Sequence, residues 1–105
     1  MILIIGVNQD KDLEGIWQEL KHNVSIAVAT KSESHRSLAP EEITKRITDY
    51  DPEATVHYTD NIEQALRHAQ ELAQTLPESI ICVCGSLYLV AEARERLLDA
   101  APETE

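Results

Sequence analysis

Four short apolar segments alternate along the chain with four amphipathic ones. The apolar segments, at residues 2–7, 24–29, 55–58 and 80–84, have the length and β-branched content of strands, although the third is short and weak. The segments that follow them repeat apolar residues every three or four positions, which is typical of helices packed on a sheet through one face. This βαβαβαβα order predicts an α/β domain with a mainly parallel sheet and right-handed connections.

Local signals mark the expected helix starts. Asp10 and Asp12 come just before the first helix, where carboxylates complement the helix dipole by about 0.3–1 kcal/mol each, so capping is the simplest role for both. Pro40 suits the first residue of the second helix. Asp60, with Glu63 three residues later, indicates a capping-box-like start for the third.

The chain length and charge limit the possible partners. At 105 residues we expect one domain over 1–99, with its last helix carried by apolar residues between 87 and 98, and an acidic tail over 100–105. A formal net charge of −10 disfavours nucleic acid, because no basic stripe is present to displace counterions from phosphates. No apolar run approaches the roughly 18 residues that span a bilayer, and no basic leader opens the chain, so we expect a cytoplasmic protein that binds no membrane.

Both cysteines fall in the fourth predicted strand. We expect Cys82 and Cys84 to be small, buried residues in a reducing compartment. We also expect their side chains to point to opposite faces of the sheet and not to pair with each other.

Several common site signatures are missing from the sequence. No glycine belongs to a GxxxxGK[ST] phosphate loop or a GxGxxG dinucleotide motif, and no serine lies in a G-x-S-x-G elbow. The sequence therefore assigns no catalytic residue. The histidines have no pair at metal-ligand spacing and no cysteine pair to complete a zinc site, so we expect surface or loop histidines and no metal site; they are His22, His35, His57 and His68.

Polar residues follow three of the predicted strands, and in a parallel sheet such loops share one edge. Arg36 can hold a carboxylate through two hydrogen bonds, and the helix start at Ser86 can hold a second anionic group. Asp10 or Asp12 can accept from an ammonium group, so together these residues match the charge pattern of an amino acid. The alternatives are that Arg36 is an ordinary solvated cation and that Gly85-Ser86 serves the turn alone.

Three strings of residues carry a family resemblance that runs in order along nearly the whole chain. They are Gly6-Val7 with Asp10-Lys11-Asp12, then His35-Arg36-Ser37-Leu38-Ala39-Pro40-Glu41-Glu42, and then Gly85-Ser86-Leu87-Tyr88-Leu89-Val90 with Glu92 and Arg94. The chain resembles the C-terminal domain of folylpolyglutamate synthase, which is often bifunctional with dihydrofolate synthase and belongs to the Mur-ligase-like enzymes.

This resemblance implies a three-layer, Rossmann-like domain of a ligase in folate biosynthesis and one-carbon metabolism. Such a ligase phosphorylates a folate carboxylate with ATP and Mg²⁺, and the amine of glutamate then attacks the acyl phosphate. The family's ATP-binding domain is absent here, so we expect this chain to bind no cofactor by itself and to be inactive alone. The resemblance implies that glutamate is bound by Ser86, Arg36, Asp10 and Asp12, with His35 beside Arg36.

The resemblance also leaves alternatives open. The strand ending in Asp-Gly-Ala-His-Asn, which usually opens this domain, is absent together with its helix, so we expect uncovered apolar surface and self-association. The chain can be part of a longer ligase, a truncated gene product, or a stand-alone α/β module that binds a small molecule or a protein without catalysis. Dihydrofolate and polyglutamate synthesis both remain possible.

Overall fold

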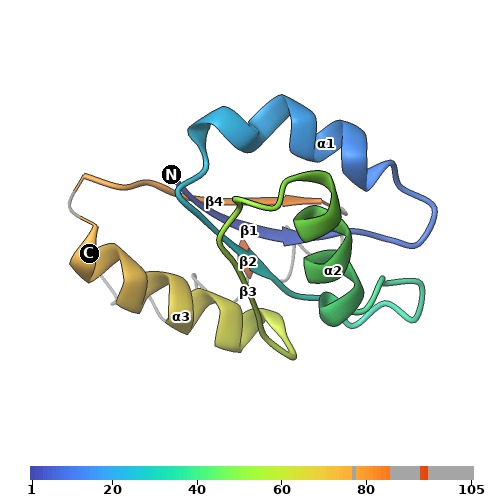
Figure 1. Ribbon diagram of the computed structural model, residues 1–105. Coiled ribbons are helices and arrows are strands. Elements are labelled where there is room, and N and C mark those ends of the chain that lie inside the picture. Colours follow the sequence, from blue (N-terminus) through green and yellow to red (C-terminus); the bar gives the residue numbers. More distant parts are fainter. Residues whose placement is uncertain (77, 86–92, 95–105) are drawn as a thin grey trace.

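The computed structural model describes residues 1–76, 78–85 and 93–94, and its centre is a four-stranded parallel sheet (Figure 1). The strand order is β3-β2-β1-β4, which places β1 and β2 inside and β3 and β4 at the two edges. The strands are β1 (Ile2–Gly6), β2 (Ile26–Ala29), β3 (Val56–Tyr58) and β4 (Ile81–Gly85). The predicted α/β fold with a mainly parallel sheet is confirmed.

Helices cover both faces of this sheet and make three layers (Figure 1). One face packs against α1 and α2, and the other packs against α3. The helices are α1 (Leu13–Leu20), extended by the short 3₁₀ turn η1 (Lys21–Asn23), α2 (Pro40–Tyr50) and α3 (Ile62–Thr75). The predicted start of the second helix at Pro40 is confirmed.

The core consists of two apolar clusters, one on each side of the sheet. Trp17 of α1 and Ile43 and Ile47 of α2 pack on the first face, whereas Ile62 and Leu66 of α3 pack on the second. All five residues of β1 are buried, because successive side chains enter opposite clusters. A central strand covered on both faces is the arrangement that its continuous apolar run predicts.

The start of α3 differs from the prediction by one residue. Asn61, not Asp60, is the capping residue, and its side-chain oxygen accepts a hydrogen bond from the backbone N–H of Gln64 at 2.9 Å. The side chain of Gln64, rather than Glu63, reaches back to accept from the N–H of Asp60 at 3.1 Å. The prediction was wrong because Asp and Asn are both good caps and lie side by side.

The two cysteines are free and half-buried, but they do not lie on opposite faces of β4. Both pack against the cluster under α1 and α2, because residues two positions apart on a strand share a face. Burial, together with the neighbouring Cys82, raises the pKa of the Cys84 thiol to about 11. Cys84 is therefore a protonated, apolar-like side chain at neutral pH.

Much of the predicted last helix, the predicted acidic tail and Ser86 lie outside the described residues. Of that helix the structure describes Ala93 and Arg94, which are helical, and Ala93 is buried in the cluster under α3. Within the described ranges, no helix is both long and apolar enough to cross a membrane.

Candidate functional site

The strand order creates a topological switch point at the carboxyl ends of β1 and β4. From β1 the chain moves outward through β2 to β3, and then crosses back to place β4 on the other side of β1. In open α/β sheets, ligands bind in the crevice outside the carboxyl ends of such strands. We therefore take this edge of the sheet, with the loops that follow β1 and β2, as the candidate site.

Two glycines meet at this point. Gly6 ends β1 and is the register partner of Gly85, which ends β4. Gly85 has a φ of +127°, and a Cβ atom at this position would overlap the carbonyl oxygen of Gly6. Only glycine satisfies both conditions, so the backbones of the two strands approach each other closely where the chain leaves β4.

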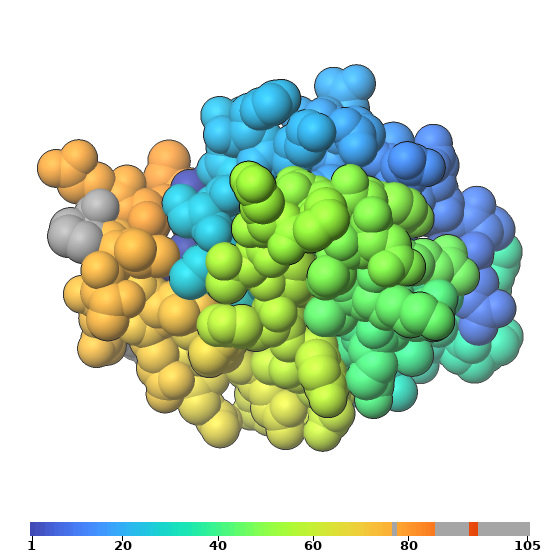
Figure 2. Space-filling view, in the orientation of Figure 1, coloured from blue at the N-terminus to red at the C-terminus, as the bar shows by residue number. Residues whose placement is uncertain are grey.

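The loops after β1 and β2 are joined to each other by main-chain hydrogen bonds. The N–H of Gln9 donates to the carbonyl of Arg36 at 2.9 Å, and the N–H of Leu38 donates to the carbonyl of Val7 at 2.8 Å. Asn8 and Ser37, which lie between these bonds, form an antiparallel bridge. The two loops consequently lie side by side at one end of the molecule (Figure 2). We call the surface formed by residues 7–12 and 30–38 the ledge.

Serine hydroxyls fix the conformation of the second loop. The Oγ atoms of Ser32 and Ser37 lie 2.9 Å apart, and Ser32 is buried with 4% exposure. Ser32 Oγ also accepts from the N–H of Ser34, whose own Oγ accepts from the N–H of Arg36, each at 3.2 Å. This network holds the backbone of Arg36 at the rim of the ledge.

At that rim, Arg36 forms an ion pair with Asp10 across the two loops. The Arg36 Nη2 atom lies 3.1 Å from Asp10 Oδ2, and the two side chains are 61% and 64% exposed. An exposed pair of this kind contributes about 0–1 kcal/mol to stability, so it can exchange partners at little cost. Two of the five residues expected to bind a ligand are thus in direct contact.

The other three expected residues have different surroundings. Asp12 caps α1, since its Oδ1 accepts from the N–H of Gly15 at 3.1 Å, as the local pattern predicts. His35 is exposed on the second loop, next to Arg36. Ser86 follows Gly85 and lies outside the described residues.

Two further residues at this edge were not singled out from the sequence. Asn8 Oδ1 and Thr30 Oγ1 are buried and have no hydrogen-bond partner among the described residues. Thr30 is fully buried directly after β2, and its N–H donates to the carbonyl of Ile5 at 2.9 Å. A buried polar atom without a partner costs about 1–3 kcal/mol, so both oxygens are places for a bound water or ligand. The sequence did contain one signal for this site, because Thr30 is a polar residue that directly follows an apolar strand.

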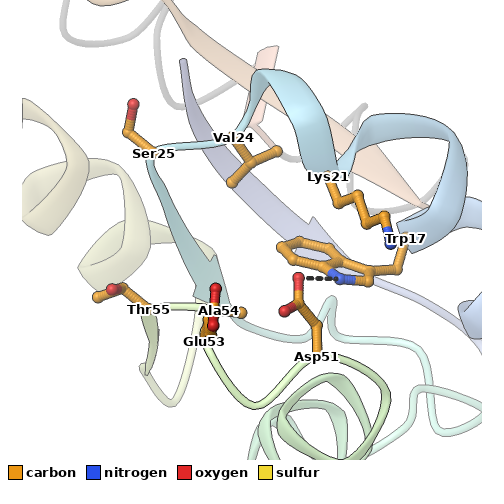
Figure 3. Close-up of a pocket in the computed structure, with 8 residues that line it drawn as sticks. All are labelled: Trp17, Lys21, Val24, Ser25, Asp51, Glu53, Ala54 and Thr55. Atoms are coloured by element: carbon orange, nitrogen blue, oxygen red, sulfur yellow. Dashed lines mark hydrogen bonds between the residues drawn. The ribbon is translucent and has the colours of Figure 1, made fainter.

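The structure has cavities at both edges of the sheet. A cavity of about 200 Å³ at the carboxyl edge lies between the loop after β2 and the start of α3, and its lining includes Lys31, Ser32 and Asn61. A second cavity, of about 220 Å³, lies at the amino edge near the end of α1 (Figure 3). There Trp17 Nε1 donates to Asp51 Oδ2 at 3.4 Å. Of these two cavities, both lined by described residues, the first adjoins the loop after β2.

Comparison with known proteins identifies the family. Residues 1–96 match the family described as the C-terminal domain of dihydrofolate synthetase. The chain belongs to this family. The predicted membership is thereby confirmed, whereas a search of curated proteins finds no match to the chain.

Two solved structures resemble this chain in fold. One is Mycobacterium tuberculosis folylpolyglutamate synthase complexed with ADP, with a TM-score of 0.79 and 21% identity over 97% of this chain and 24% of that one. The other is the same enzyme complexed with ADP and AMPPCP, with a TM-score of 0.73 and 22% identity over 98% and 24%. The chain spans about a quarter of their length, and the likeness confirms the Rossmann-like fold.

Two common signatures of Mg²⁺ and nucleotide sites are missing, one from the described residues and one from the sequence. The described residues contain no group of three His, Cys, Asp or Glu side chains placed to hold a metal ion. The sequence also lacks the glycine-rich loop and lysine that cradle a nucleotide's phosphates. We therefore derive no chemical step through either group.

Proposed function

We propose that this domain is the glutamate-binding part of an ATP-dependent ligase of the folylpolyglutamate synthase and dihydrofolate synthase type, and that it is inactive alone. The observation that carries the proposal is the Arg36–Asp10 ion pair at the carboxyl edge of the sheet. Family membership supports a ligase of this type. That glutamate joins a folate carboxylate is what the resemblance described above implies. ATP and Mg²⁺ would be held by the remainder of such a ligase.

Glutamate would bind by exchanging partners with this ion pair. Its α-carboxylate would replace Asp10 on the guanidinium of Arg36, and its ammonium would contact the released Asp10 carboxylate. The exchange replaces one opposite-charge contact with two, because the zwitterion carries both signs. It breaks a solvent-exposed pair worth about 0–1 kcal/mol and allows a two-point contact between Arg36 and the α-carboxylate.

The other predicted site residues extend this contact. Ser86, at the expected helix start after Gly85, would receive the second carboxylate of glutamate. Asp12 would remain the cap of α1 and add negative charge beside the ammonium. His35 would border the guanidinium of Arg36 and limit the access of water.

The contribution of this domain to the reaction would be positioning. Holding the amine of glutamate next to an activated acyl group converts a bimolecular encounter into a local one, which can supply about 7–11 kcal/mol of the barrier when the geometry is well aligned. The hydrogen bonds between the loops would supply the rigidity that such positioning requires. The acyl group and its activation would come from the rest of the ligase.

Calorimetric titration with glutamate tests the proposed site. We expect wild type to bind glutamate and Arg36→Ala to bind at least about tenfold more weakly, because one charge-assisted contact is worth about 1.5–3 kcal/mol. Arg46→Ala is the matched control. Arg46 pairs with Glu42 at 2.9 Å on α2, and its hydrogen bond lowers the pKa of that carboxyl group.

Equal weakening by the two substitutions, or no heat with wild type, would overturn the proposed site. A second assay tests the claim that the domain is inactive alone. The isolated chain, supplied with ATP, Mg²⁺, glutamate and dihydropteroate, should form no product. Product above the no-protein control would contradict that claim.

We also propose that the isolated domain self-associates. Ile80, which precedes the edge strand β4, is 67% exposed, and the strand itself is only partly buried. A second copy covering this edge would remove apolar surface from water. Gel filtration at high micromolar concentration should give a species larger than the monomer, and a clean monomer would count against self-association.

A further inference from the structure

Two histidines that are eleven positions apart in the sequence lie in contact between the edge strand β3 and helix α3. His57 Nδ1 of β3 lies 2.8 Å from His68 Nε2 of α3. The ring centroids are 5.0 Å apart and the ring planes are inclined at 47°. His57 pairs across the sheet with Val28, which belongs to the cluster under α3, so the ring is on the face that α3 covers.

We propose that His57 and His68 form a binding site for a divalent transition-metal ion such as Ni²⁺, Cu²⁺ or Zn²⁺. Neutral imidazole nitrogen is a common ligand for each of these ions. The sequence predicted no metal site because the two residues are eleven positions apart. The packing of α3 on β3 brings the two histidine rings together although they are not at a metal-ligand spacing along the sequence.

A nearby carboxylate favours, at one of the two rings, the proton position that metal binding needs. Glu71 Oε1 lies 4.0 Å from His68 Nδ1, which is beyond hydrogen-bond distance, but its negative charge favours a proton on that nitrogen. We therefore assign the proton of His68 to Nδ1 and a free lone pair to Nε2. His57 Nδ1–H then donates to that lone pair. A carboxylate behind a ligating histidine is the usual outer partner in metal sites, where it orients the ring and increases its basicity.

Metal binding at this pair needs no change in net protonation. The ion takes the place of the proton between the two rings, and His57 carries that proton on Nε2 instead of Nδ1. Both rings then present a lone pair to the ion while remaining neutral. Each ring forms one nitrogen–metal bond, and two water ligands leave the ion. The Nδ1–H bond of His57 and the hydrogen bond between the rings break, and an Nε2–H bond forms on His57 by proton exchange with water.

The spacing of the rings is suitable for a chelate. With metal–nitrogen bonds of about 2.0 Å, adjacent ligands lie about 2.8 Å apart at a right angle and about 3.3 Å apart in a tetrahedral site. The observed 2.8 Å equals the first value and is about 0.5 Å short of the second. The rings must swivel so that their lone pairs converge, and for right-angle coordination the nitrogens need not move apart.

The coordination positions of the ion that the two histidines do not fill would be open to solvent. His57 is partly exposed and the His68 side chain is 33% exposed, so an ion can reach both nitrogens. Within the described ranges no third His, Cys, Asp or Glu completes the set, and water would fill the other positions. We therefore expect weaker binding than at a four-ligand structural zinc site, with Cu²⁺ held most tightly.

The test is calorimetric titration of the untagged chain with NiCl₂, CuSO₄ and ZnCl₂. We expect one ion per chain, and at least tenfold weaker binding for His57→Gln and for His68→Gln. The matched controls are His22→Gln and His35→Gln, which remove exposed histidines and should leave the affinity unchanged. Glu71→Gln should weaken binding without removing a ligand, because it changes the orientation of His68 alone.

A second measurement keeps the proposal testable if a histidine variant folds poorly. In ¹⁵N imidazole spectra of the wild-type chain, substoichiometric Ni²⁺ should broaden His57 Nδ1 and His68 Nε2 before any other ring nitrogen. The proposal is overturned if wild type binds none of the three ions. It is also overturned if the double variant His57→Gln/His68→Gln binds as wild type does, or if His22 or His35 broadens first.

Discussion

Replacing Gly85 by alanine should severely destabilise the domain, because two independent features of the structure require glycine there. The backbone φ of +127° lies in a region that residues with a Cβ rarely adopt. The new Cβ would also overlap the carbonyl oxygen of Gly6 on the neighbouring strand. That obstacle is backbone in the middle of a parallel pair, so it cannot turn aside as a flexible side chain would.

The expected cost follows from these two terms. A left-handed backbone conformation costs a residue with a Cβ about 1–2 kcal/mol. Forcing an extra carbon into a packed position costs about 1–3 kcal/mol more. The sum, about 2–5 kcal/mol, is a large fraction of the roughly 5–15 kcal/mol that stabilises a domain of this size.

Urea denaturation followed by tryptophan fluorescence measures this loss. Trp17 is the single tryptophan of the sequence and is buried under the sheet, so its emission reports global unfolding. With a slope of about 2 kcal/mol per M, the midpoint of Gly85→Ala should fall by about 1–2.5 M. Cys84→Ala, one residue earlier on the same strand, is the matched control and should cost only about 1 kcal/mol. A midpoint for Gly85→Ala at or above that of Cys84→Ala would refute the reasoning.

Two further predictions concern single side chains. Asn61→Ala should lower the free energy of unfolding by about 1 kcal/mol, because it removes the cap of α3. Asp60→Ala should change this free energy by less than half as much. Equal losses for the two variants in urea titrations would contradict the assigned cap. Cys84, with its pKa raised to about 11, should react slowly with iodoacetamide at pH 7–8, and its rate should keep rising with pH up to about 11; a plateau near pH 9 would contradict this.

The elements of the fold were predictable from local patterns. The apolar period of three to four residues predicted the helices that became α1 and α2, because each helix buries one stripe against the same face. The continuous apolar run of β1 predicted a strand covered on both faces, and it is. Caps were less predictable, since Asp60 and Asn61 have nearly equal capping ability and only backbone geometry separates them.

The contacts between elements were not predictable in the same way. Alternation of strands and helices does not specify the order β3-β2-β1-β4, and therefore not the closeness of Gly6 to Gly85. The sequence placed Asp10 and Arg36 at one edge, but their contact depends on the main-chain bonds between two loops. His57 and His68 meet only because α3 lies against the edge strand.

The most direct test of the central claim is to map where glutamate binds on the ¹⁵N-labelled domain by amide chemical shifts. The account predicts that titration with glutamate shifts the amides of residues 7–12 and 30–38 and of Gly85, and that Arg36→Ala removes these shifts. Glutamine, which keeps the α-amino acid but lacks the second carboxylate, should still shift the amides of the two loops but should shift the amide of Gly85 more weakly. Shifts centred instead on the amino-edge cavity of Trp17 and Asp51, or no shifts at all, would contradict the claim.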